Sequence, residues 1–130
     1  MLALADTHVV ENVSRELENY NLYTQDRALQ DAVVREGADW ADESLVAFGH
    51  AVGQADYLQL GFAANKYTPE FDTHDRFGNR VDLVSYHPAY HTLMDSAVRH
   101  GLHSSPWTDP RSGAHVARAA HSYLQGQVEA

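Results

Sequence analysis

Apolar side chains recur at helical spacing through most of the chain from about residue 24 onward. The first such stretch predicts a helix at about 24–36. Thr24 can cap this helix, Asp26 favours its positive N-terminal end, and Gly37 stops it. The expected buried stripe comprises Leu29, Ala32, Val33 and Val34.

The same periodicity continues into two further helices, expected at about 42–52 and 54–66. Gly49 and Gly53 weaken the earlier of the two, and Gly53 is its natural stop. Pro69 closes the region, because the residue before a proline disfavours helical geometry. The apolar positions of these helices are Leu45, Val46, Phe48, Val52, Tyr57, Leu58, Phe62 and Ala63.

Between about 71 and 86 the pattern changes from helical spacing to alternation. Val81 and Leu83 share one side of an extended segment, and Asp82 lies on the other. Gly78 and Asn79 form a turn signal just before it. This stretch therefore predicts a short, irregular hairpin between helices.

A fourth helix is expected from Pro88 to about Gly101, with His87 at its cap. Its stripe comprises Tyr90, Leu93, Met94, Ala97 and Val98. His87 and His91 are four residues apart and could share a metal ion, but a site needs at least one further ligand. The zinc-protease pattern also requires a glutamate where Pro88 stands. The spacing therefore favours a capping histidine and a partly buried one over a metal site.

The last segment is the most regular helix, expected to start at Asp109 and Pro110 as cap and first residue. It is rich in small residues, namely Gly113, Ala114, Ala117, Ala119 and Ala120, with bulk at Val116, Tyr123, Leu124 and Val128. Small residues serve either close packing between helices, which we favour, or a wall beside a flat ligand. No helix stop signal precedes Ala130, so we expect the chain to be truncated within a larger protein.

Residues 1–23 have no helical period and predict an extended N-terminal arm. Its expected anchors are Leu17, Tyr20, Leu22 and Tyr23. The arm can lie on the body of its own fold or on another subunit.

The composition indicates one globular domain: 130 residues, 44% hydrophobic and 21% charged. The net charge of -9 is concentrated in residues 1–60, which carry -8, so binding of nucleic acid by this segment is not expected. No apolar run is long enough for a membrane span, and the start lacks the basic region of a secretory signal. With no cysteine, the chain is compatible with a cytoplasmic protein.

No catalytic or metal-binding set emerges from the motifs. The glycines are scattered and form no phosphate-binding loop. Ser104 and Ser105 near His103 lack a nucleophile elbow. Beyond the pairs His87/His91 and His100/His103, the histidine spacing suggests no ligand set.

Several segments resemble a known family in the same order and with similar spacing. These are THVVEN, ENYNLYTQDRAL, VVREGADW, YHPAYHTLM and DPRSGAHVARAAHSYLQGQVEA. Together they resemble the N-terminal region of acyl-CoA dehydrogenases of the AidB type, the adaptive-response flavoprotein branch linked to alkylation damage. The resemblance extends from about Thr7 to Ala130 and implies that the stretch with His87 and His91 is a family motif without a metal.

The resemblance implies an all-α fold: an acyl-CoA dehydrogenase N-terminal-domain-like helical array of about five helices with one short hairpin. The domain would cover residues 24–130 and stop before the family's middle β-domain. In the family FAD lies mainly between the middle and C-terminal domains, and the catalytic carboxylate lies in the C-terminal bundle. The chain is therefore expected to contain no catalytic residue and to bind no FAD alone, and its flavin-contacting residues are unknown.

Two functions remain open at this point. In the first, the chain is the N-terminal domain or subunit of an FAD-dependent acyl-CoA dehydrogenase-like oxidoreductase, walling the acyl/flavin cavity and supporting oligomer contacts. Its partners would be further copies or a separate chain with the remaining domains, and acyl-CoA in the full enzyme. In the second, it is a non-catalytic helical scaffold or binding module in a damage-protection protein. Whether the chain belongs to an enzyme depends on which is right.

Overall fold

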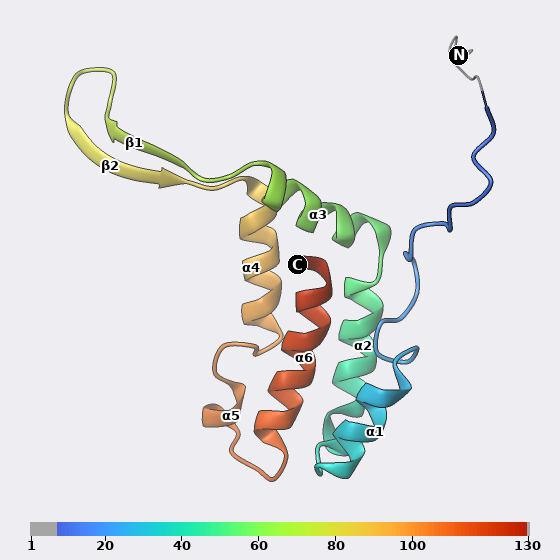
Figure 1. Ribbon diagram of the computed structural model, residues 1–130. Helices are drawn as coiled ribbons and strands as arrows, with labels where there is room; N and C mark the ends of the chain where they lie inside the picture. The colour runs from blue at the N-terminus through green and yellow to red at the C-terminus, as the bar shows by residue number, and fades with distance from the viewer. Residues whose placement is uncertain (1–7, 130) are drawn as a thin grey trace.

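The computed structural model describes residues 8–129, and this part of the chain forms a helical body with one projecting hairpin (Figure 1). Its helices are α1 (Arg27–Arg35), α2 (Asp42–Val52), α3 (Ala55–Lys66), α4 (Pro88–Arg99), α5 (Ser105–Thr108) and α6 (Ala114–Glu129), with a 3-10 turn at Asp39–Ala41. Strands β1 (Glu70–His74) and β2 (Arg80–Ser85) pair antiparallel. The fold is therefore not strictly all-α, because β1 and β2 form a small sheet. The expected helices and hairpin are present.

The core lies around α6, which packs against α1, α2, α3 and α5, while α3 also packs against α4. Figure 1 shows α6 running between α4 and α2. The most deeply buried large side chains are Tyr23, Phe48, Leu45, Leu124, Val33 and Val52. They come from the arm and from α1, α2 and α6, so the core joins segments from both ends of the described chain.

The glycines of α2 allow the arm to pack directly on the helix. A Cβ on Gly53 would overlap the carbonyl oxygen of Tyr20, and one on Gly49 would overlap Asn21 and Tyr23. The Leu22 amide donates to the Gly49 carbonyl at 3.1 Å. These glycines, which weaken a helix in isolation, are required here for close approach of the backbones.

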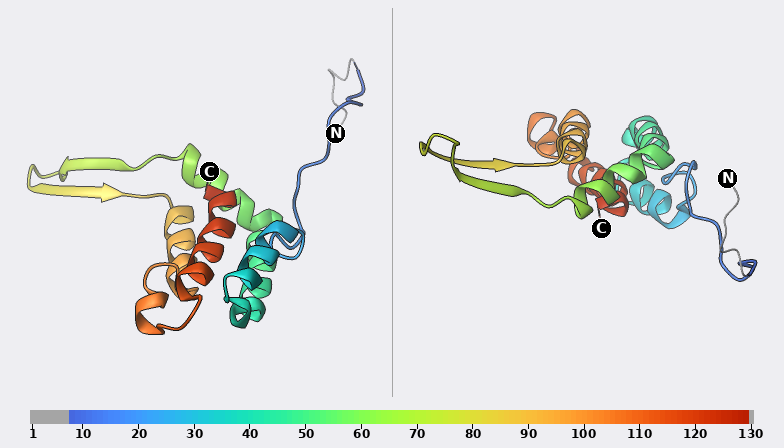
Figure 2. Two further views of the ribbon diagram at one scale, coloured as in Figure 1. Left: turned by 60° about the horizontal axis from the view of Figure 1, so that its bottom comes forward. Right: turned by 90° about the horizontal axis from the view of Figure 1, so that it is seen from above.

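The inner end of the arm is firmly held, and its outer part is not. Tyr23 is 1% exposed, and burial together with Asp42 raises the pKa of its hydroxyl to about 12. The Asn21 side chain accepts from the Tyr23 and Thr24 amides and donates to the Val46 carbonyl. Leu17, expected as an anchor, is 77% exposed. Toward its beginning the described chain extends away from the helices (Figures 1 and 2).

The cap of α1 is Asp26 and not Thr24. The Asp26 carboxylate accepts a hydrogen bond from the Leu29 amide at 2.9 Å, while Thr24 lies in the turn before it. Val34 is 61% exposed, so the buried stripe is narrower than predicted. The helix ends as expected before Gly37, which has φ 77°.

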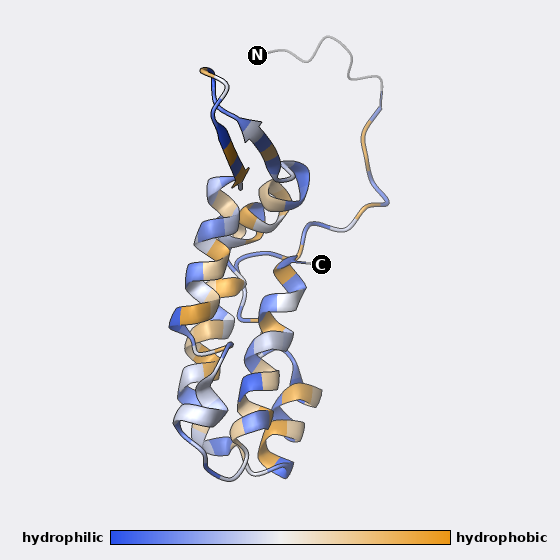
Figure 3. Ribbon diagram, turned by 90° about the vertical axis from the view of Figure 1, so that its left-hand side faces the viewer, coloured by the Kyte–Doolittle hydropathy of each residue, from blue (hydrophilic) through white to orange (hydrophobic). Residues whose placement is uncertain are grey.

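The hairpin projects away from the helical body, on the side opposite to the arm (Figures 1 and 2). All residues of β1 and β2 are exposed. Phe71 pairs with Val84, and the register shifts between Asp72 and His74. Figure 3 shows that hydrophobic and hydrophilic residues both occur along the strands.

The end of the chain differs from the predicted boundaries. The last helix begins at Ala114 and not at Pro110, because Gly113 adopts φ 80° and packs against the Gly37 carbonyl. The short helix α5 precedes it and was not predicted. Phe62, Met94, Val98 and Tyr123, expected in apolar stripes, are between 47% and 61% exposed.

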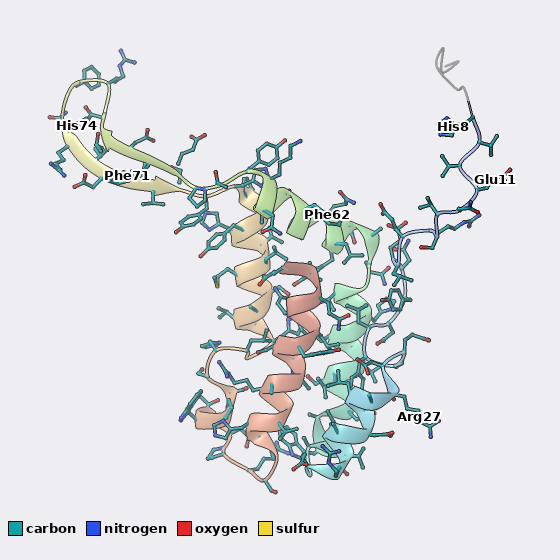
Figure 4. The ribbon with its side chains drawn as sticks, in the orientation of Figure 1. His8, Glu11, Arg27, Phe62, Phe71 and His74 are labelled. Atoms are coloured by element: carbon teal, nitrogen blue, oxygen red, sulfur yellow. The ribbon has the colours of Figure 1, made fainter. Side chains whose placement is uncertain are left out.

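The chain exposes far more surface than a compact protein of its mass. The accessible area is 9546 Å², whereas a compact protein of 14.5 kDa exposes about 6,900 Å². The arm and the hairpin account for the open shape (Figure 4, labels His8, Glu11, Phe71 and His74). No helix within residues 8–129 has the length and apolar character needed to cross a membrane.

Candidate functional site

His87 and His91 lie at the root of the hairpin and have separate structural roles. The Ala89 amide donates to Nδ1 of His87 at 3.1 Å, so His87 caps α4 as predicted. Its ring stacks on Tyr67, with centroids 4.8 Å apart. His91 is exposed and meets Tyr86 and Tyr90 edge-on. Within residues 8–129, no group of three or more histidine or carboxylate side chains is placed to hold a metal ion.

A partly buried polar network, centred on buried Gln125, joins α6 to α3 and α4. The Tyr57 hydroxyl lies 2.8 Å from Oε1 of Gln125 and 2.9 Å from Oγ of Ser96. Nε2 of Gln125 donates to Oε1 of Glu129 at 2.7 Å. Burial raises the pKa of the Tyr57 hydroxyl, which therefore stays protonated at neutral pH. This network holds the C-terminal half of α6 in one position.

The small residues of α6 lie on two different faces. Ala114, Ala117 and Ala120 are buried and pack inside the helical body, as the packing interpretation predicts. A second set is exposed and spaced so that it shares one face: His115, Ala119, Ser122 and Gly126. A Cβ on Gly126 would meet no atom within 4 Å. Around Gly126 the exposed face is therefore open and able to lie beside another surface or a flat ligand, whereas at its other end His115 contacts the Trp107 ring.

Ser44 and His121 form a pair that sequence reasoning did not find. Oγ of Ser44 lies 2.9 Å from Nε2 of His121, and Nδ1 of His121 lies 2.8 Å from the Ala117 carbonyl. His121 is 6% exposed, and this burial lowers the pKa of its imidazole. The two residues are 77 positions apart in the chain, and no local pattern connects them.

The other histidine and serine pairs considered from the sequence do not form a site of their own. Nδ1 of His100 lies 2.7 Å from the Ser96 carbonyl. His103 is exposed and has no hydrogen bond with Ser104 or Ser105 among the contacts of this region. Ser104 and Ser105 instead begin α5.

The hollows among the described residues single out no site for FAD. The two cavities within the helical body have volumes of about 180 and 210 Å³. Pockets for drug-sized ligands span roughly 300–1,000 Å³, and FAD is at least of that size. A wider hollow of about 460 Å³, lined by Leu17, Leu58 and Phe62, lies beside the arm and is open to solvent. No residue is therefore assigned to the flavin.

The fold of this chain matches part of two longer solved structures. Caenorhabditis elegans ACDH-11, solved in complex with C11-CoA, matches with a TM-score of 0.75 and 19% identity over 95% of this chain and 22% of its own. The apo form of Bd2924 matches with the same TM-score and identity over 92% of this chain and 24% of its own.

The family follows from sequence comparison. The family described as the adaptive response protein AidB N-terminal domain matches residues 12–130. The putative acyl-CoA dehydrogenase AidB of Escherichia coli strain K12 is 46% identical over 125 residues, or 95% of this chain. The chain therefore belongs to the AidB N-terminal domain family, which confirms the resemblance found in the sequence. It spans 23% of the length of the Escherichia coli relative.

Proposed function

We propose that the chain acts as the N-terminal helical domain of an FAD-dependent acyl-CoA dehydrogenase-like oxidoreductase. The observation that supports this proposal most directly is the 46% identity to the putative acyl-CoA dehydrogenase AidB over 95% of this chain. In such an enzyme the flavin accepts a hydride while a carboxylate removes a proton from the acyl thioester. In this proposal the chain provides neither the flavin site nor the carboxylate. It instead positions and supports the other domains and excludes water from the cavity.

The exposed face of α6 is the surface best suited to wall the acyl/flavin cavity. Ala119, Ser122 and Gly126 leave the helix backbone accessible, so an extended or planar molecule could approach closely. The network of Tyr57, Gln125 and Glu129 keeps this helix rigid. A rigid helix with small side chains gives a defined wall without filling the space beside it.

The open shape supports the proposal that another protein surface covers the arm and the hairpin. Every residue of β1 and β2 is exposed, and the described part of the arm exposes Val9, Val10, Val13 and Leu17, which is apolar surface that a partner could cover. We propose that the partners are further copies of the chain or the remaining dehydrogenase domains. Residues 1–23 would form the arm and 24–130 the domain, in a protein of the cytoplasm.

The test uses the protein purified at its natural length from its source cells. We expect a yellow protein whose flavin absorbance bleaches when a saturated acyl-CoA is added under nitrogen, because the flavin takes up the hydride. The 130-residue chain alone is expected to bind no FAD in a fluorescence titration. A colourless full-length protein that takes up no added FAD would contradict the proposal and favour the scaffold alternative.

A further inference from the structure

A cavity of about 180 Å³ lies at the end of the helical body where the start of α2, the end of α4, α5 and the start of α6 meet. Its polar lining comes from Ser44, His100, Ser105, Asp109, Arg118 and His121. Trp40, Ala41, Ala114 and Ala117 supply apolar walls. The cavity is on the buried-alanine side of α6 and not on the exposed face discussed above.

Arg118 brings a positive charge to this cavity without a carboxylate partner. Its Nε donates to the Leu102 carbonyl at 2.5 Å, and its guanidinium carbon lies 5.8 Å from the Trp107 ring centroid. No carboxylate among residues 8–129 lies within 4.0 Å of its nitrogens. Asp109 also lines the cavity, but Arg111 binds it at 2.7 Å. A half-buried guanidinium thus retains its terminal N–H donors for a ligand.

The two imidazoles of the cavity are held in the same tautomer. Nδ1 of each lies near a carbonyl oxygen four residues earlier, of Ser96 for His100 and of Ala117 for His121. A carbonyl only accepts, so Nδ1 carries the proton in both rings and Nε2 is the acceptor. The Ser44 hydroxyl then donates to Nε2 of His121. Neither imidazole carries a negative charge, so neither neutralises Arg118.

We propose that this cavity binds a small monocarboxylate of a few carbon atoms. A planar carboxylate matches the fork of Arg118, and Ser105, which can donate from its hydroxyl, also lines the cavity. The short carbon chain would contact Trp40, Ala41 and Ala117. A phosphate dianion fits less well, because the single unpaired cation would leave one of its charges uncompensated next to Asp109.

The binding test titrates the 130-residue chain with sodium butyrate at constant ionic strength. Its only tryptophans, Trp40 and Trp107, lie in the cavity wall and beside Arg118, so their fluorescence reports on this site. We expect a saturable change with butyrate and none with its neutral analogue butyramide at tenfold higher concentration. Equal responses to both compounds, or no response to butyrate, would overturn the proposal.

The residue test compares Arg118→Gln with Arg99→Gln. Both variants remove one arginine charge from a helix, but Arg99 is exposed and pairs with Asp95 at 2.7 Å. We expect Arg118→Gln to weaken butyrate binding at least tenfold and Arg99→Gln to change it less than twofold. Equal weakening would mean general electrostatic attraction and would contradict the proposal.

A second measurement is available if Arg118→Gln fails to fold. In the unmodified chain labelled with nitrogen-15, the Nε–H signal of Arg118 should shift with butyrate along the fluorescence titration curve. The Nε–H signal of Arg99 serves as the internal control and should stay in place. An unmoved Arg118 signal at saturating butyrate would overturn the proposal.

Discussion

Gly53 lies so close to the carbonyl oxygen of Tyr20 that no side chain can be added between them. The Asn19 amide donates to the Gly53 carbonyl at 2.7 Å, so arm and helix are joined backbone to backbone. Gly53 has φ -83°, an angle open to any residue. Glycine is therefore required at position 53 because there is no room for a side chain, and not because of the backbone conformation.

We predict that Gly53→Ala lowers the free energy of unfolding by ~2 kcal/mol or more, because the arm must move away from α2. The matched control is Gly126→Ala, where the added Cβ meets no atom. That change should be neutral or stabilise by up to ~1 kcal/mol through helix propensity. Urea unfolding of the two variants measures both effects, and equal shifts would show that the arm does not dock on Gly53.

Tyr57 should contribute to stability through its hydroxyl. Tyr57→Phe leaves Oε1 of Gln125, a residue 4% exposed, without its donor, and we expect a loss of ~1–2 kcal/mol in the free energy of unfolding. Tyr67→Phe is the control, because Tyr67 is 50% exposed and contacts His87 through its ring. Denaturant titration should show a larger loss in the free energy of unfolding for Tyr57→Phe than for Tyr67→Phe. Small, similar losses for both variants would argue against a rigid network on α6.

The stability of the chain should depend on pH through His121. Burial holds the pKa of His121 in the folded state below its ordinary value near 6.5. The unfolded state therefore binds more protons as the pH falls through 6.5, and protonation favours unfolding. The stabilisation is complete above pH 6.5 and decreases below it, by at most ~1.4 kcal/mol per pH unit for one proton.

His121→Gln is the variant that tests this linkage. After burial, the charge of nearby His100 is a further cause that lowers the pKa of His121. Urea unfolding between pH 5.5 and 7.5 should show a shallower pH dependence for His121→Gln than for the unmodified chain. Parallel curves would mean that His121 is not the group responsible.

The hairpin should promote association of the chain. Phe71 and Val84 face each other across the strands and are 61% and 46% exposed. We expect light scattering to give a mass above 14.5 kDa that rises with concentration. Phe71→Ser should reduce this mass, because it removes apolar surface from the interface. Val34→Ser, at an equally exposed position on α1, should leave the mass unchanged. A constant mass of 14.5 kDa for the unmodified chain would contradict the expectation.

Sequence patterns predicted the helices whose signals are local. The bounds of α2 and the cap of α4 by His87 follow from neighbouring residues alone. The start of α6 was placed too early, because Gly113 packs against Gly37, which lies far away in the sequence. Val34 was expected in the buried stripe of α1 and is exposed, and Leu17, expected to anchor the arm on its own fold or on another subunit, is exposed in this chain. An apolar residue can face a partner surface as well as the core of its own chain.

The polar sites could not be predicted for the same reason. Ser44 and His121 meet only because α2 and α6 pack side by side. Arg118 differs from the paired arginines because no carboxylate among residues 8–129 lies near it. This is a property of the folded chain and not of the sequence around Arg118. The family, by contrast, was visible in the sequence, because its segments keep their order along the whole chain.

The role of α6 as a cavity wall is tested most directly by Gly126→Trp in the full-length protein, measured by the rate at which an acyl-CoA bleaches the flavin. A Cβ at position 126 would meet no atom within 4 Å and Gly126 is exposed, so we expect the fold and the flavin content to remain unchanged. Val34→Trp is the control, because Val34 is an exposed residue of α1. We predict that Gly126→Trp slows bleaching at least tenfold, whereas Val34→Trp changes it less than twofold. Equal rates for Gly126→Trp and the unmodified protein would contradict the proposal that this helix walls the acyl/flavin cavity.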